Sequence, residues 1–417
     1  MPSTFAANLY PVPRRFINVG AEGTAGTIAA ATYTFPMTVF KPVDKFTRLK
    51  DSAWRNAMGD VYNLIDGVRI SDLSMGGPVF GDGIGYPLLN TLGDYYQSVT
   101  GTSTTATTLS APYTAGAATI SVTSATNLST GGTFALGTLG TTNEEVRTAT
   151  TISGTTVTPN APFYQSHASA APVTPYTAVT SYNHFFALLN GGTGAGGFAQ
   201  AQPKTYTFTD YTGVTATSGA RNYGYTCFSE LSLTSTATEL FMWEGKATAL
   251  ASGTATTTPT TSLTTVAPQA AWRSTVTLGG SQDFEEAEWK IVFARKVEPK
   301  WTNSGQQDPF AIARGYLGVN FTLDIDPAIN ENDFIDYLAN TQPTLSLVAN
   351  NGLTGLGTAE TLTITANQLG FETGELVEKE TFGYQLSGCM VDNTTNIGPS
   401  GGFGPCIVQL SNGVVSY

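Results

Sequence analysis

The feature that most constrains the fold is a strict two-residue alternation of apolar and polar side chains. It is cleanest where Leu317, Val319, Phe321, Leu323 and Ile325 alternate with small, polar or acidic residues. Successive side chains of a β-strand point to opposite faces, so this pattern predicts a strand with one buried face. Similar runs recur at residues 33–39, 62–75, 205–209, 225–242 and 289–294. The sequence therefore predicts a mainly β protein with antiparallel strands.

The composition agrees with this interpretation. Charged residues make up only 12% of the 417 residues, so Thr, Ser, Asn and Gly must supply most of the polar surface. The net charge of −12 disfavours a protein that grips nucleic acid, because such proteins are normally basic. It leaves open a protein past which nucleic acid slides without sticking.

Two helices interrupt the strands. At residues 82–100, an apolar stripe of Ile84, Leu88, Leu92 and Tyr95 predicts a helix with Asp82 as its N-cap, buried against a sheet. Residues 331–339 predict a second helix with Phe334 and Leu338 facing inward. In the strand at 62–75, the apolar phase changes near Ser71, which predicts a bulge there. Pro36 predicts that the strand at 33–39 lies at a sheet edge.

The segment at 102–177 differs from its surroundings, because its only charged residues are Glu144, Glu145 and Arg147. Its short alternating runs predict a small inserted all-β domain. The expected organisation is an N-terminal arm at 1–27, a discontinuous β domain at 28–101 and 178–417, and the insertion at 102–177. The densest charge cluster lies at 41–59, which we interpret as a long exposed loop or hairpin tip. Its charges fit a solvated surface and a contact surface equally well.

No motif predicts catalysis, a cofactor or a metal site. Gly192, Gly194 and Gly197 match GxGxxG, but a proline and a strand follow where a dinucleotide site needs a helix. Asp324 and Asp326 begin a run that resembles a calcium loop in composition only. Neither His167 nor His184 accompanies a nucleophile motif. The three cysteines, Cys227, Cys389 and Cys406, form no CxxC pair, and we interpret them as thiols without a disulfide or zinc.

The sequence contains no membrane-spanning run of 18 apolar residues, and its first residues lack a signal-peptide core. We expect a protein that folds in a cytoplasm and does not enter a membrane.

The order of several segments resembles the major tail tube protein of long-tailed, non-contractile phages. These are RRFINVGAEGTAGT, FKPVDKFTRLKD, VYNLIDGVRISDLSMGGPVFGDGIGYPLLNTLGD and WKIVFARKVEPKWTNSGQQDPFAIARGYLGVNFTLDI. The segment GAATISVTSATNLSTGGTFALGT is similar to small β modules inserted in phage structural proteins. The force of the resemblance lies in the order of the parts.

The resemblance implies two packed antiparallel sheets with a flanking helix, in subunits that form hexameric rings with one continuous inner β-barrel. Rings would stack into the virion's tail tube around a tape-measure protein, between tail terminator and distal tail proteins, and later conduct double-stranded DNA. The arm and the loop at 41–59 would make the contacts between rings, and the insertion would project outward. The stacking candidates are Arg14, Arg15, Lys41, Asp44, Lys45, Arg48, Lys50 and Asp51.

An acidic chain suits a bore that repels phosphates. We therefore expect some of four acidic residues to face the lumen: Asp283, Glu285, Glu286 and Glu288. Two glutamates could in principle pair for acid–base chemistry. Because neighbouring residues of a strand point to opposite faces, only Glu286 and Glu288 can lie on the same one. A solvated face is the simpler interpretation.

Two other functions remain open. One is a phage adhesin or baseplate-type β protein that binds cell-surface glycan through the insertion. The other is a hydrolase. Tubes or six-fold rings in micrographs would favour assembly, isolated monomers or trimers would favour the adhesin, and a hydrolysis screen would address the third.

Overall fold

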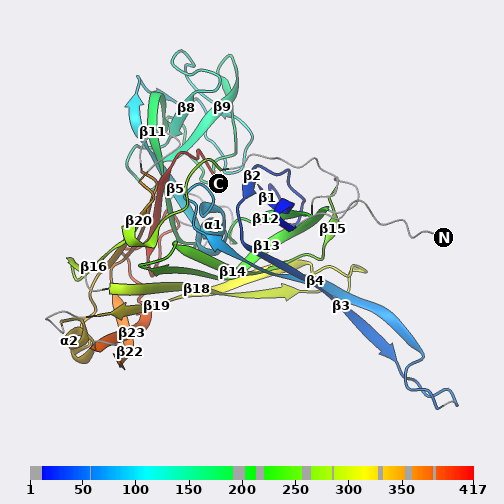
Figure 1. Ribbon diagram of the computed structural model, residues 1–417. Helices are drawn as coiled ribbons and strands as arrows, with labels where there is room; N and C mark the ends of the chain where they lie inside the picture. The colour runs from blue at the N-terminus through cyan, green and yellow to red at the C-terminus, as the bar shows by residue number, and fades with distance from the viewer. Residues whose placement is uncertain are drawn as a thin grey trace, which may run out of the picture.

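The computed structural model describes residues 12–56, 58–190, 202–212, 220–255, 264–283, 286–326, 332–352, 359–378 and 382–417. In these ranges the chain is built mainly from antiparallel strands arranged in two large sheets (Figure 1). Their inner faces share one continuous apolar core. The predicted mainly β fold with two antiparallel sheets is confirmed, and neither sheet closes into a barrel within the described ranges. The helical elements are η1 (Val12–Arg14), α1 (Gly85–Leu92), η2 (Ala271–Arg273) and α2 (Asn332–Ala339).

The first sheet runs β3-β4-β14-β13-β18-β19-β23-β22, and β2, β1 and β12 join it along the first part of β13. Its cleanest strand is the one predicted from the alternation at 317–325, where all five apolar side chains are buried. The strands are β1 (Phe16–Ala21), β2 (Tyr33–Phe35), β3 (Val39–Asp51), β4 (Asn63–Pro78), β12 (Tyr206–Tyr211), β13 (Ala220–Thr236), β14 (Met242–Ala249), β15 (Gly253–Thr254), β18 (Glu286–Lys300), β19 (Ala311–Ile325), β22 (Leu369–Glu378) and β23 (Phe382–Met390).

The second sheet runs from β17 through β16, β20, β21, β24 and β11 into the inserted segment, with β5 and β6 also paired to β11. Gly279 and Gly280 both have positive φ and form the turn between β16 and β17. The strands are β5 (Gly93–Ser103), β6 (Thr107–Thr108), β7 (Ile120–Ser121), β8 (Thr133–Leu136), β9 (Glu145–Ser153), β10 (Thr156–Pro159), β11 (Pro172–Leu188), β16 (Thr275–Leu278), β17 (Ser281–Asp283), β20 (Leu345–Asn350), β21 (Thr361–Ala366) and β24 (Ile407–Asn412).

Helix α1 is wholly buried and packs against β13 and β11. The side chain of Asn90 fixes it there: its Nδ2 donates to the carbonyl oxygens of Lys204 and Thr226 at 2.8 and 2.9 Å, and its Oδ1 accepts from the Phe228 amide at 2.7 Å. β13 exchanges partner at this point, because it pairs with β12 up to Thr226 and with β14 from Cys227 onward. The helix therefore clamps the position where one strand serves two groups of neighbours.

The expected length of this helix was wrong. Gly93 adopts a left-handed conformation with φ of 91° and ends the helix, so residues 93–103 form β5 and pair with β11. Tyr95 is buried as expected, but it belongs to a strand. Asp82 is not the N-cap, since that position is Ile84, and the Asp82 carboxylate accepts a hydrogen bond from the Tyr33 hydroxyl at 2.9 Å.

Part of the expected arm lies within the fold. Residues 1–11 are outside the described ranges, whereas Phe16–Ala21 forms β1, pairs with both β2 and β12, and buries Ile17 and Val19. The alternation of these apolar residues with Asn18 and Gly20 is the strand signal in the sequence. Strand β2 ends at Phe35 and lies at the edge of the sheet, which agrees with the prediction from Pro36.

Two further local expectations were wrong. The bulge in β4 lies between the pairs Phe46–Arg69 and Arg48–Asp66, away from Ser71. Gly67 lies there, and a Cβ on it would come within 3.1 Å of the Thr47 carbonyl oxygen. In α2, Leu338 faces outward with 68% of its surface exposed.

The segment at 102–177 surrounds a core of its own, built around Leu109, Ile120, Phe134, Val157 and Phe163. Strands β5 and β11 run into this module from the main part of the second sheet, and the expected boundaries at 101 and 178 fall inside both strands (Figure 1).

Candidate assembly surfaces

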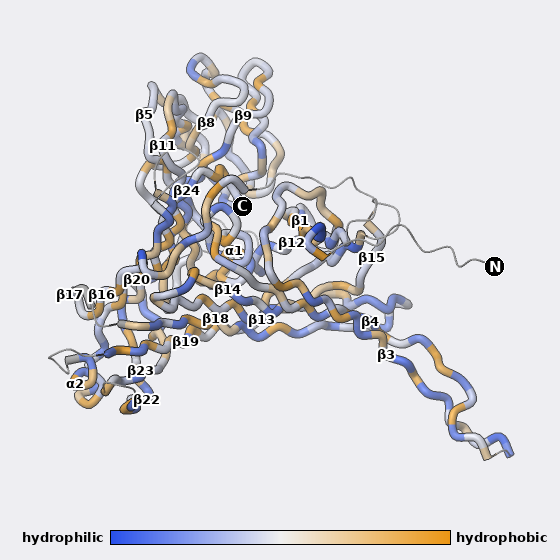
Figure 2. Tube along the Cα trace, in the orientation of Figure 1, coloured by the Kyte–Doolittle hydropathy of each residue, from blue (hydrophilic) through white to orange (hydrophobic). Residues whose placement is uncertain are grey.

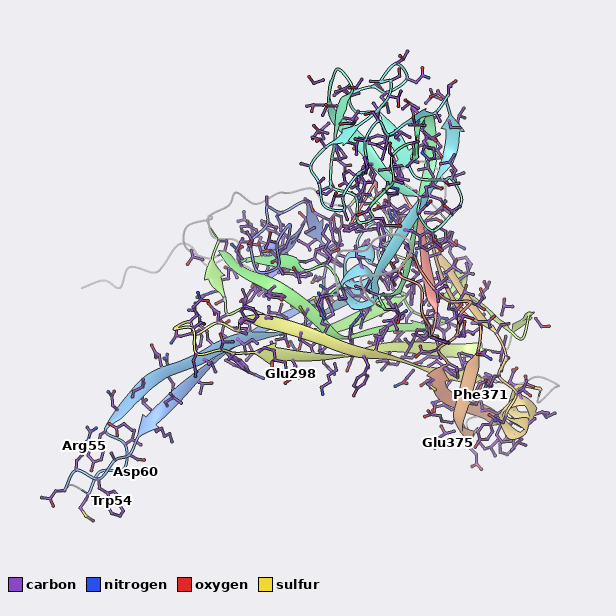
Figure 3. The ribbon with its side chains drawn as sticks, turned by 180° about the vertical axis from the view of Figure 1, so that it is seen from behind. Trp54, Arg55, Asp60, Glu298, Phe371 and Glu375 are labelled. Atoms are coloured by element: carbon purple, nitrogen blue, oxygen red, sulfur yellow. The ribbon has the colours of Figure 1, made fainter. Side chains whose placement is uncertain are left out.

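The β3–β4 hairpin extends far beyond the rest of the first sheet (Figures 1 and 3). The long exposed element predicted at 41–59 is therefore a two-stranded ribbon, with Trp54 and Met58 fully exposed at its tip. Hydrophobic positions continue along the ribbon outside the core (Figure 2). Contiguous exposed apolar surface marks interaction sites in soluble proteins. The exposed apolar residues of the ribbon are Val39, Val43, Phe46, Leu49, Trp54, Met58, Val61, Leu64, Ile65 and Val68.

Most charges of the hairpin are engaged within it. Lys45 pairs with Asp72, Arg48 with Asp66, and Asp51 with Arg55. These pairs neutralise the ribbon's charges without fixing its tip, since exposed ion pairs contribute little stability.

Asp44 fastens the base of the hairpin to its neighbours. Its carboxylate accepts hydrogen bonds from the hydroxyls of Ser71 and Ser252 and from the Ser252 amide. Partial burial acts to raise the pKa of Asp44, but these hydrogen bonds leave it below its usual value. Like Asp44, the expected stacking residues Lys41 and Lys50 make no ion pair within the described ranges.

The two arginines at the beginning of the described chain differ in their surroundings. Arg15 holds both oxygens of Asp210 at 2.8 and 2.7 Å, and its guanidinium lies 5.3 Å from the ring centre of Phe40. This contact ties the start of β1 to β12, so Arg15 serves the subunit itself. Arg14 is exposed in η1.

The four acidic lumen candidates lie where β17 leads into β18. Asp283 ends β17 in the second sheet, while Glu286 and Glu288 begin β18 in the first, and Glu285 is outside the described ranges. Glu288 is half-buried and accepts a hydrogen bond from the Thr236 hydroxyl at 3.1 Å. A register shift separates Glu286 from Glu288 in the pairing with β19. Their exposure to a lumen stays a prediction.

A second apolar surface lies at the opposite end of the molecule, where α2 packs on β22 and β23 (Figures 1 and 3). We call the exposed side chains of Ile335, Leu338, Leu376 and Phe382 the α2–β22 patch. The sequence analysis missed this surface, because it predicted neither β22 nor β23. The sequence feature that could have indicated this surface is the position of Leu376 and Phe382 among glutamates, but the same combination also fits an exposed loop.

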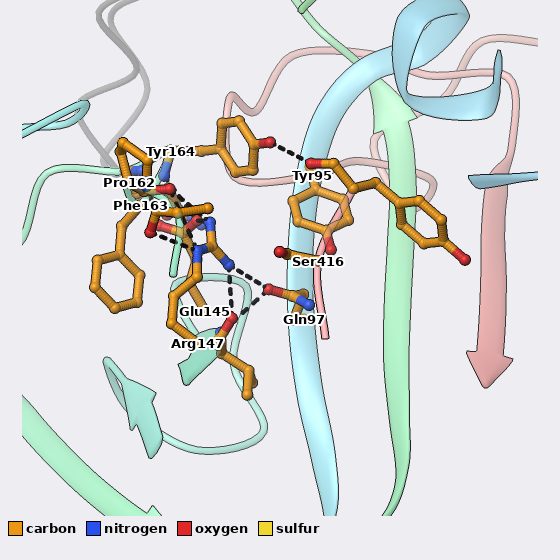
Figure 4. A network of polar contacts seen from close by, with 12 residues as sticks. Tyr95, Gln97, Glu145, Arg147, Pro162, Phe163, Tyr164 and Ser416 are labelled. Atoms are coloured by element: carbon orange, nitrogen blue, oxygen red, sulfur yellow. Dashed lines mark hydrogen bonds and ion pairs between the residues drawn. The ribbon is translucent and has the colours of Figure 1, made fainter. Parts of the chain in front are cut away.

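A buried polar network joins the inserted module to the main sheet (Figure 4). The guanidinium of Arg147, fully buried, donates to Gln97 Oε1 on β5 at 2.7 Å and contacts Glu145 Oε1 at 3.3 Å. Glu145 also accepts from the amides of Tyr164 and Gln165, both at 2.8 Å. Because each ion has several partners, this pair fixes the geometry between module and sheet. From the sequence, Glu145 and Arg147 were noted only as two of the few charged residues of the segment, and their pairing was not predicted.

Both histidines are buried among groups of the fold. His184 is fully buried, and its Nδ1 lies 2.6 Å from the Tyr95 hydroxyl, while its Nε2 lies 2.9 Å from the Val414 carbonyl oxygen. Burial lowers the pKa of His184 to about 3, so the ring is neutral. His167 lies 3.6 Å from the buried Glu145 carboxylate.

The module also has a pocket of about 240 Å³, lined by Thr105, Ala106, Thr107, Ser124, Thr126, Asn127, Leu128 and Pro175. Across the described ranges, no cluster of three His, Cys, Asp or Glu residues has the arrangement of a metal site, and neither helix has the length and apolarity to cross a membrane. The GxGxxG residues at 192–197 lie outside those ranges.

The sequence matches no known family, and no curated protein matches it either. The function must therefore be argued from the surfaces of the molecule itself.

Proposed function

We propose that this protein is a structural subunit that assembles with copies of itself into stacked rings. The assembly would be the tail tube of a long-tailed, non-contractile phage, through which double-stranded DNA passes. The observation that carries the proposal is the β3–β4 hairpin, which leaves the fold (Figure 3) and keeps Phe46 and Leu49 about half exposed and Trp54 fully exposed. Assembly with other copies would remove this surface from water.

Two further features support the proposal. The first sheet has open edges, which a ring of subunits can satisfy by pairing strands between copies. The net charge of −12 suits a bore that conducts DNA without retaining it. A tape-measure protein would fill this bore before the DNA, and the candidates for its wall are still Asp283, Glu285, Glu286 and Glu288.

Sedimentation velocity and negative-stain microscopy of the purified chain test this proposal. The wild type is expected to form rings or tubes at high concentration. Phe46→Asp should shift the population to monomers, because it puts a charge into the buried face of the contact. Phe403→Asp, at another exposed phenylalanine, is the matched control and should assemble normally. A wild-type protein that stays monomeric at every concentration would contradict the proposal.

The pocket in the module favours a second candidate, an adhesin that binds cell-surface glycan. Its lining of Thr107, Ser124, Thr126 and Asn127 offers hydrogen-bond partners to sugar hydroxyls. Aromatic side chains, on which sugar rings commonly stack, are absent from that lining, so the assembly proposal has the stronger support. Binding on a glycan array that Asn127→Ala abolishes would favour the adhesin.

A further inference from the structure

Besides β2, the first sheet has open edge strands at β3 and β22. β3 pairs only with β4 at one end, and β22 pairs only with β23 at the other, among the strands that the structure describes. The hairpin and the α2–β22 patch lie at opposite extremes of the molecule (Figures 1 and 3). An open edge presents unpaired N–H and C=O groups, which the strand of another chain can satisfy.

The edge at β22 adjoins the α2–β22 patch. The helix packs directly on the strand, since a Cβ on Gly374 would come within 2.8 Å of the Tyr337 ring, and Phe334 stacks on Tyr384 with ring centres 4.8 Å apart. Leu376 is the cross-strand partner of Tyr384, so it lies on the face that the helix partly covers. Leu376 and Phe382 are nevertheless 56% and 65% exposed. The helix thus forms one wall of an apolar surface that remains open on the other side.

The charges along β22 indicate which strand can pair with this edge. Along β22, Glu372, Glu375 and Glu378 are exposed, and none of them makes an ion pair within the described ranges. Pairing β22 with the β22 of another copy would set these glutamates against one another. On β3, Lys45, Arg48 and Asp51 have charged partners within the hairpin. Lys41, Lys50 and Asp44, whose carboxylate is held by neutral serine groups, then leave this strand a net positive charge. Two copies of β3 would therefore repel each other, whereas β3 and β22 attract.

We propose that the open edge of β22, together with the α2–β22 patch, receives the β3–β4 hairpin of a second copy of this chain. Strand pairing between copies would join the first sheet of one copy to the first sheet of the next. Leu376 and Phe382 would cover apolar side chains of the hairpin such as Phe46 and Leu49. The inference rests on the self-assembly proposed above and specifies its surfaces. Because donor and receiver are different parts of the chain, the contact is head-to-tail and leads either to a closed ring or to an open filament.

A charge exchange tests the pairing. Variant one carries Glu375→Lys and Glu378→Lys, and variant two carries Lys41→Glu and Lys50→Glu. Each alone should raise the concentration needed for assembly by roughly tenfold, since like charges then meet at every contact. Mixed in equal amounts, they should assemble as the wild type does, because each hairpin again meets a patch of opposite charge. Restoration on mixing requires that both variants are folded. Variants that assemble normally alone, or mixtures that fail to recover, would overturn the inference.

A cross-link then locates the contact. A photoreactive residue replaces Leu376 in chains of one isotope composition, and these are assembled with unmodified chains of another. Cross-links should join position 376 to peptides from Val39–Pro78 of the other isotope. The same residue at Leu139, an exposed leucine of the inserted module, is the control and should not reach those peptides. If the wild type assembles but position 376 links elsewhere, the inference fails while self-assembly stands. If the wild type does not assemble, self-assembly itself fails.

Discussion

Glu360 has only 1% of its surface exposed, and its carboxyl group packs against the backbone of Gly81. Burial, followed by the nearby charge of Asp82, raises the pKa of Glu360 to about 8. The folded protein therefore keeps this proton up to about pH 8, whereas the unfolded chain releases it near the ordinary value of about 4.3. Since the folded state binds more protons in this window, its stability falls as the pH rises from about 4.3 to 8.

Replacing Glu360 with Gln should remove this dependence. We expect Glu360→Gln to be more stable than the wild type by about 1–2 kcal/mol at pH 8, with the difference vanishing near pH 4.5. Denaturant unfolding at several pH values measures it. Glu298→Gln is the control: Glu298 is exposed on β18, and its hydrogen bond with Lys300 lowers its pKa, so that variant should not gain stability as the pH rises. A constant difference between Glu360→Gln and wild type across the pH range would contradict the prediction.

A second prediction also concerns a single residue, Arg147, whose side chain joins the inserted module to β5 of the main sheet. Arg147→Met would leave Glu145 buried without its cation, at a cost of roughly 3–5 kcal/mol. Hydrogen exchange should rise across β8, β9 and β10 before the rest of the chain is affected. Arg48→Met removes an exposed ion pair and should change stability by no more than about 1 kcal/mol. Equal effects of the two substitutions would contradict the role assigned to Arg147.

At the scale of elements, sequence patterns predicted strands such as β18 and β19, whose buried positions carry large apolar side chains, but they did not predict β1, β22 or β23. The alternation in β19 is complete because the core covers one of its faces and not the other. In β3 most side chains are exposed on both faces, so no period appears and the sequence indicated only an exposed element at 41–59. The alternation at 62–75 did predict a strand, and β4 buries the side chains of Leu73 and Met75 there. The spacing of Tyr95 fits a helix and a strand equally, and only the left-handed Gly93 separates them. The candidate surface at β22 had only an ambiguous sequence signal in Leu376 and Phe382, because contacts with α2 create the surface.

The hairpin tip can be shortened without touching the core. Replacing residues 51–63 with Asn-Gly would close the ribbon at the pair Lys50–Leu64 with a two-residue turn that suits the twist of the strands. The thermal midpoint should stay within about 2 °C, because no buried side chain is lost. Assembly should weaken, since Trp54 and Met58 are removed. A large drop in the thermal midpoint, or unaltered assembly, would show that the tip has a different role.

At the scale of the whole molecule, the two sheets and the module form one connected body. The apolar core lies between the sheets, the hairpin leaves at one end, and the α2–β22 patch, beside the glutamates of β22, lies at the other. Removing residues 1–27 would take away β1 and the Arg15–Asp210 contact, so such a deletion tests folding and not only stacking.

The ladder of β5 and β11 pairs Leu188 with Gly93 and continues to Tyr176 and Ser103. The chain therefore enters and leaves the module side by side, roughly 5 Å apart. A stem whose ends are already held together adds little entropy cost for whatever it carries, even when the insert is long. It is a graft point: a peptide tag, a reporter enzyme or an antigen could replace the native module there while the first sheet and the pairing from β17 through β24 to β11 and β5 are kept.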